Sequence, residues 1–142
     1  MAEQQKVTIR LPDDLRPAER EEIGFEIIEH IRERSKRGIG VRRAGRGFTA
    51  KVFPNYSEKY AARKGQNNVD LTLSQEMLES IEVLKHRKGE VTIGFQRGSD
   101  VNAKAEGNQI GSYGRSPNPR KARRFLGLTR DELDLILEEY GA

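Results

Sequence analysis

The sequence predicts an α+β fold, in which a long N-terminal helix packs across a small antiparallel sheet, with short peripheral helices and long basic loops. Two observations near the start predict a strand and then a helix: a stretch of alternating side chains and a run of isoleucines with helical spacing. A third observation, two alternating runs around a glycine turn, predicts a β-hairpin. The chain of 142 residues fits a single domain, residues 1–142, with one modest core.

The first strand and the long helix have the clearest patterns. Residues 6–11, KVTIRL, alternate and contain β-branched side chains, so we expect a short strand there. The helix is predicted over residues 17–35, since Pro17 suits a first helical turn and Gly38 suits a stop. Its apolar stripe consists of Ile23, Ile27, Ile28 and Ile31.

Two stretches lack sustained periodicity and are predicted to be loops. Residues 36–56 are rich in glycine and arginine, and they predict a long mobile loop, because loops of this length in a compact domain are usually functional or disordered. Residues 111–121 contain prolines and predict a second loop.

Short elements are predicted between these loops. Ser57 is positioned to cap a short helix through SEKYAARKG, and Ser74 is positioned to cap another over QEMLESI, after the extended stretch VDLTL. Apolar alternation on both sides of HRKGE predicts a hairpin with Gly89 in its turn. Asp100 begins a further predicted helix, which ends at Gly111.

The C-terminal residues predict a strand followed directly by a helix. The stretch KARRFLGL, residues 121–128, indicates a final strand, and strand alternation predicts that one of Phe125 and Leu126 is buried while the other faces outward. Thr129 and Glu132 form a capping box at the start of the final helix. The apolar face of that helix consists of Leu133, Ile136, Leu137 and Tyr140.

Composition and charge narrow the classes of function. Hydrophobic residues make up 35% and charged residues 34% of the chain, so the core is small and parts of the chain are expected to order against a partner. The net charge is +4, and basic stretches at residues 32–46 and 115–124 lie beside acidic helices. The absence of cysteine excludes disulfides, thiolate metal sites and a cysteine nucleophile.

No targeting or catalytic pattern is readable. The start, MAEQQKVTIR, lacks the apolar core of a signal peptide, and no apolar run is long enough for a membrane span, so we expect synthesis in a cytoplasm and no membrane partner. The two histidines, His30 and His86, have no converging metal or acid–base partners. With no phosphate-binding loop or nucleophile motif either, we expect a protein that is not an enzyme and uses no cofactor or metal.

Arginines and aromatic residues in the two predicted loops favour two non-enzymatic functions. They can contact phosphates and stack on single strands, although no DNA-binding motif is readable. They are also residue types enriched in protein interfaces, and the acidic first and last helices provide a surface of opposite sign. A head-to-tail contact between unlike patches closes into a ring when the rotation permits. The candidate interface residues are Arg42, Arg43, Arg46, Phe53, Tyr56, Arg120, Arg123, Arg124 and Phe125.

The C-terminal stretch PNPRKARRFLGLTRDELDLI resembles the C-terminal signature of the bacteriophage virion-morphogenesis and tail-completion proteins. In that family a loop with proline and arginine leads into a strand and then a capped helix with acids in its first turn. Three upstream stretches also resemble segments of phage neck proteins, and they follow one another along the chain in the same order as those segments. They are FPNYSEKYAARKG, VDLTLSQEMLESI and AKAEGNQIGSYG. The signature positions are filled by Arg123, Phe125, Leu126, Gly127, Leu128, Thr129 and Asp131.

This resemblance implies a structural subunit of the tailed-phage virion neck, either a tail-completion protein or a head–tail connector. Such a subunit assembles as a homo-oligomeric ring around the DNA passage, touching a connector or portal on the head side or the terminator on the tail side. It is located in the virion neck, and in the host cytoplasm during assembly. The alternative from the residues alone is a basic nucleic-acid-binding module that acts through its arginine-rich loops.

Overall fold

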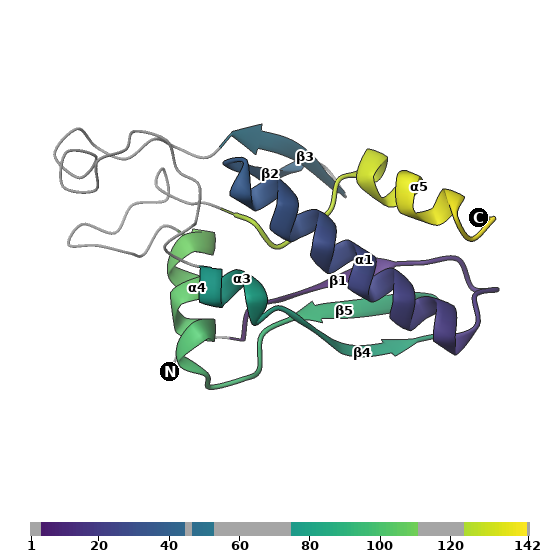
Figure 1. Ribbon diagram of the computed structural model, residues 1–142, viewed down its shortest axis with the longest axis horizontal. Helices are drawn as coiled ribbons and strands as arrows, with labels where there is room; N and C mark the ends of the chain where they lie inside the picture. The colour runs from purple at the N-terminus through teal and green to yellow at the C-terminus, as the bar shows by residue number, and fades with distance from the viewer. Residues whose placement is uncertain (1–3, 45–46, 53–74, 111–123, 142) are drawn as a thin grey trace, which may run out of the picture.

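The computed structural model describes residues 4–44, 47–52, 75–110 and 124–141, and it confirms the α+β class (Figure 1). A three-stranded antiparallel sheet has the order β1-β5-β4, and β2 and β3 form a separate two-stranded sheet. The strands are β1 Lys6–Arg10, β2 Ile39–Ala44, β3 Gly47–Val52, β4 Glu82–Arg87 and β5 Glu90–Gly94. The helices are α1 Pro17–Lys36, α3 Gln75–Glu79, α4 Asp100–Ile110 and α5 Arg130–Glu138.

The three-stranded sheet has one apolar and one polar face. Val7 and Val83 both pair with Ile93, and Ile9 pairs with Val91, so these side chains share the face toward the core. The predicted hairpin is confirmed, because β4 and β5 pair around a turn in which Gly89 has a φ of +84°. That backbone region is open to glycine and unfavourable for other residues.

Helix α1 covers the apolar face of this sheet, as predicted. Ile23, Ile27 and Ile31 have no exposed surface, which confirms the predicted stripe. Close approach of helix and sheet depends on Gly24, because a Cβ at that position would lie 2.8 Å from Val83 Cγ2. In the buried core, the rings of Phe95 and Phe125 meet edge to face, and their centroids are 6.0 Å apart.

The prediction of a long loop over residues 36–56 is wrong for its described part. After α1, Gly38 adopts a φ of +78° and the chain reverses into strand β2, which pairs with β3 from Ile39↔Val52 to Ala44↔Gly47. The strand pattern was not detectable because Val41, the deeply buried apolar side chain of β2, has Gly40 before it and Arg42 and Arg43 after it. Residues 53–56 lie outside the described residues.

The described part of the predicted final strand, residues 124–128, is irregular with a bend at Leu126 and belongs to neither sheet, so the strand prediction is wrong there. One backbone bond joins it to the first hairpin, from Val41 N to Arg124 O at 2.8 Å. Phe125 and Leu126 are 0% and 2% exposed, so the prediction that one of them faces outward is wrong. The alternation of buried and exposed side chains fails here because this backbone is hydrogen-bonded by side chains from two helices and not by a second strand.

The remaining helix predictions are confirmed where the structure describes them. Helix α5 begins with the predicted capping box, in which Thr129 and Glu132 each accept a backbone hydrogen bond from the other. Helices α3 and α4 occupy the predicted QEMLESI and Asp100 positions. The predicted helix after Ser57, the extended stretch 69–73 and the second loop at 111–121 lie outside the described residues.

Candidate assembly surfaces

The segment 124–128 is held by two polar side chains from distant parts of the sequence. Gln109 on α4 accepts hydrogen bonds from Phe125 N at 2.7 Å and Leu126 N at 3.1 Å through Oε1. Arg34 on α1 donates from Nη2 to Phe125 O at 2.7 Å and to Gly127 O at 3.1 Å. Both side chains are buried, so together they satisfy a backbone that would otherwise lack partners in the core.

Arg34 also joins the two acidic helices. Its Nη1 donates to Glu132 Oε1 at 2.6 Å, and the same carboxylate oxygen accepts from Thr129 N at the start of α5. Burial lowers the pKa of Arg34, and the Glu132 carboxylate opposes that shift, so the guanidinium remains a cation in the core. The burial of Arg34 between two helices was not predicted from the sequence.

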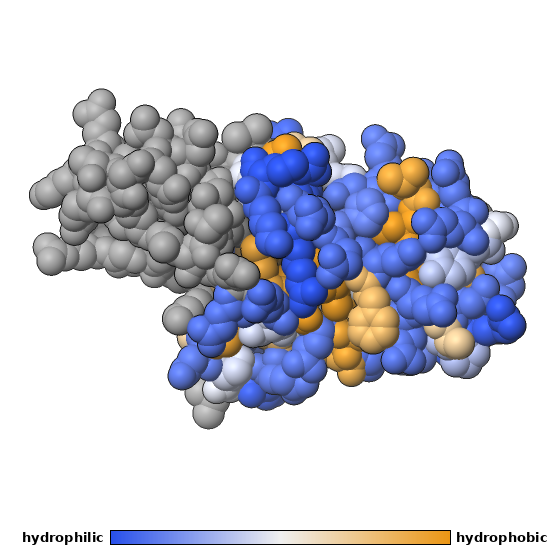
Figure 2. All heavy atoms as spheres, viewed as in Figure 1, coloured by the Kyte–Doolittle hydropathy of each residue, from blue (hydrophilic) through white to orange (hydrophobic). Residues whose placement is uncertain are grey.

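A groove of about 450 Å³ lies between α1 and α5, on the surface side of this joint. Leu135 is 57% exposed at the groove, and among the described residues Phe25 on α1 is the other large hydrophobic residue with an exposed side chain. Figure 2 shows these helices on a largely hydrophilic face that carries hydrophobic surface over α5 and over the middle of α1. The groove is lined by Glu26, Glu29, His30, Leu135, Ile136, Glu138 and Glu139.

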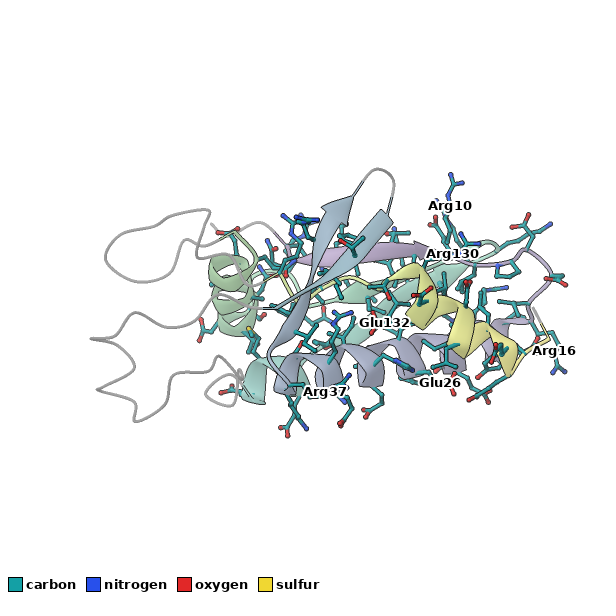
Figure 3. All side chains as sticks on the ribbon, turned by 90° about the horizontal axis from the view of Figure 1, so that it is seen from above. Arg10, Arg16, Glu26, Arg37, Arg130 and Glu132 are labelled. Atoms are coloured by element: carbon teal, nitrogen blue, oxygen red, sulfur yellow. The ribbon has the colours of Figure 1, made fainter. Side chains whose placement is uncertain are left out.

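The carboxylates of the groove are crowded against one another. Burial raises the pKa of Glu26, and the neighbouring Glu139 carboxylate raises it further. Glu26 Oε2 is buried without a hydrogen-bond partner, on the side of α1 that faces α5 (Figure 3). Desolvation, followed by the charges of Glu26 and Glu22, raises the pKa of Tyr140 to about 12. A groove with this excess of carboxylates favours a cation.

Within the described lining of the groove, His30 is the one side chain that can carry positive charge. Arg32 lies nearby on α1, but it pairs with Glu29 at 2.9 Å and donates to the backbone of Leu78. Among the described residues no group of three or more histidines, aspartates or glutamates has the geometry to hold a metal ion. The groove therefore suits a cationic side chain from another molecule better than a metal.

The interface residues predicted from the sequence divide into three groups. Arg42 is exposed on β2 beside Arg43, whose position is given by its pairing with Phe48. Arg124 is half-buried and lies next to this hairpin, whereas Phe125 belongs to the core and is corrected from an interface residue to a packing residue. The others, Arg46, Phe53, Tyr56, Arg120 and Arg123, lie outside the described residues.

Sequence reasoning found the acidic helices but missed the groove between them. The available signal was Leu135, which lies off the apolar face formed by Leu133, Ile136 and Leu137 on the final helix. Phe25 breaks the isoleucine stripe of α1 in the same way. An apolar side chain out of register with its own helix face indicates a second contact surface.

Comparison with protein-family models, curated proteins and solved structures gave no match. In the described residues no helix has both the length and the apolar character needed to cross a membrane.

Proposed function

We propose that this protein is a structural subunit of the tailed-phage virion neck, a tail-completion or head–tail connector protein that assembles as a ring. In this proposal it is not an enzyme, it uses no cofactor, and its neighbours are further copies and other neck proteins. The observation that carries the proposal is the acidic groove with exposed Leu135, in a chain whose net charge is +4. The sequence resemblance of the C-terminal signature supports the same class.

The contact between copies is head-to-tail. The groove between α1 and α5 receives a cationic side chain from the neighbouring copy, and Arg42 on the β2–β3 hairpin is the described candidate, since it is exposed. Leu135 adds an apolar contact beside the charges, which a protein partner needs and a free ion does not. Two unlike patches on one chain give a heterologous interface, and such an interface closes into a ring when the rotation permits.

Charge reversal tests the contact. Glu138→Lys places a like charge opposite the incoming arginine, and it should abolish self-association measured by sedimentation velocity over a concentration series. A lysine in the last turn of α5 complements the helix dipole, so folding should be unaffected. The matched control is Glu21→Lys on α1, which makes the same charge change at an exposed residue away from the groove.

Rescue of self-association by a second charge reversal tests whether Glu138 and Arg42 contact each other. A chain carrying both Glu138→Lys and Arg42→Glu restores the opposite-sign pair, and it should associate again. Loss of association in the Glu21→Lys control, or no rescue in the double variant, contradicts this contact. The biological assignment has its own test, which is electron microscopy of virions with this protein labelled; absence of label from the neck contradicts the proposal.

A further inference from the structure

The face of the three-stranded sheet opposite α1 is polar: its residues on β1 and β4 are exposed, while Thr92 at its centre is buried, and we call it the open sheet face. Val83 and Val91 point toward Gly24 of α1, so the residues that alternate with them point the other way. Strand register arranges these residues in three rows across β1, β5 and β4. The rows are Lys6–Gly94–Glu82, Thr8–Thr92–Lys85 and Arg10–Glu90–Arg87.

Three cations on this open sheet face have no charge partner. Lys6, Arg10 and Lys85 are exposed, and none of them forms a salt bridge within the described residues. Figure 3 shows Arg10 pointing away from the body of the protein, on the side of the sheet opposite α1. The fourth cation of the face, Arg87, is neutralised by Glu90 at 2.6 Å.

The chemistry of the open sheet face selects its partner. Its paired positions carry no aromatic or large apolar side chain, which a protein interface core or stacking on single-stranded bases requires. Lysine and arginine side chains are instead groups that contact phosphate in a nucleic-acid backbone, whereas the hydroxyls of Thr8 and Thr92 hydrogen-bond each other at 2.8 Å. The acidic groove of another copy is a poor fit, because a narrow groove takes a projecting side chain and not a flat sheet.

The spacing of the three cations fits a duplex. Lys6 and Arg10 are four residues apart on β1, about 13 Å, and Lys85 lies two strands away, about 10 Å. The major groove of B-DNA is about 12 Å wide, so long side chains at these spacings reach phosphates on both of its edges. We propose that the open sheet face binds the phosphate backbone of duplex DNA without reading its sequence. This surface is separate from the α1–α5 groove and does not depend on ring assembly.

Fluorescence anisotropy with a labelled, mixed-sequence DNA duplex tests the proposal. If three phosphates are neutralised, the slope of log affinity against log salt is about −2.7, so raising salt from about 50 to about 200 mM weakens binding roughly 40-fold. The triple variant Lys6→Gln, Arg10→Gln, Lys85→Gln should lose this binding. Each single variant should reduce the slope by about one, which gives a readout that does not depend on the triple variant folding.

The control variant carries the same charge change elsewhere. Arg16→Gln, Arg37→Gln and Arg130→Gln remove three exposed cations that lie off the sheet, and this chain should keep the affinity and slope of the unmodified protein. Equal loss in both triple variants means that net charge alone attracts DNA, and it overturns the proposal. The proposal also fails if the unmodified protein does not bind duplex at low salt, or if it binds single strands more tightly.

A last comparison separates this surface from the proposed assembly contact. The triple variant of the sheet face should still self-associate, and Glu138→Lys should still bind duplex with an unchanged salt slope. If removing the three cations abolishes self-association and leaves DNA binding intact, the open sheet face is a protein contact and the proposal is wrong. If the arginines of β2, Arg42 and Arg43, prove to carry the salt dependence instead, the site is wrongly placed.

Discussion

Replacing Arg34 by methionine, which keeps much of the volume and removes the charge, should destabilise the protein severely. The side chain is 4% exposed and makes three strong contacts: the Glu132 carboxylate at 2.6 Å, Phe125 O at 2.7 Å and Gly127 O at 3.1 Å. Removing one partner of a buried ion pair costs about 3–5 kcal/mol of unfolding free energy. Each carbonyl left unsatisfied adds about 1–3 kcal/mol, while water relieves Glu132, whose side chain is 19% exposed.

These costs together are about 5–11 kcal/mol before hydration of Glu132, and with that relief we expect, from the lower end of the range, a net loss of about 4 kcal/mol, a large part of the 5–15 kcal/mol that stabilises an ordinary domain. Urea unfolding followed by circular dichroism measures it, and the melting temperature should fall by about 12 °C for a chain of this length. The comparison variant is Arg130→Met, which removes an exposed pair with Asp134 and should cost no more than about 1 kcal/mol. A loss below about 1 kcal/mol for Arg34→Met refutes the claim that this side chain joins the two helices.

Three further substitutions test the groove and the buried segment. Glu26→Gln should stabilise the protein near neutral pH, because the pKa of Glu26 is raised in the folded state and its ionised form therefore disfavours folding. The melting temperatures of the variant and the unmodified protein should converge below pH 4.5, the ordinary pKa of the carboxyl, and separate as pH rises. Equal melting temperatures at neutral pH contradict the crowding of carboxylates. Gly127→Ala brings a Cβ to within 2.7 Å of Val41 Cγ2, so unfolding in urea should show a loss of about 1–3 kcal/mol. Phe125→Ala should cost about 3–5 kcal/mol in the same assay, and a melting temperature unchanged by this substitution contradicts its burial.

Local pattern predicted the elements whose partners are near in sequence or whose stripe is regular. The isoleucines of α1, the turn at Gly89 and the capping box at Thr129 each carry their signal within a few residues. The first hairpin was missed because its strand β2 buries Val41 deeply but carries Gly40, Arg42 and Arg43 around it, which leaves no hydrophobic alternation to detect.

The candidate site was less predictable because it depends on contacts between distant residues. Residues 124–128 have an apolar pattern that fits a strand, yet their backbone bonds go to Arg34, 91 residues earlier than Phe125, and to Gln109, 16 residues earlier. Likewise, acids on two helices look like ordinary solvated charge until α1 and α5 pack side by side and crowd Glu26 against Glu139. No local window of sequence contains either relationship.

The position of Phe125 in the chain has a consequence for synthesis. The core formed by α1 and the sheet is complete only after the segment that follows residue 123 has been synthesised. Phe125 of this segment packs against Phe95 and belongs to the same buried cluster as the earlier elements. During translation α1, β1 and the β4–β5 hairpin can pack on one another, but Phe95 lacks its aromatic partner until residue 125 has emerged. Nascent chains arrested before residue 124 should remain sensitive to protease, and protection should appear only once α5 has left the ribosome.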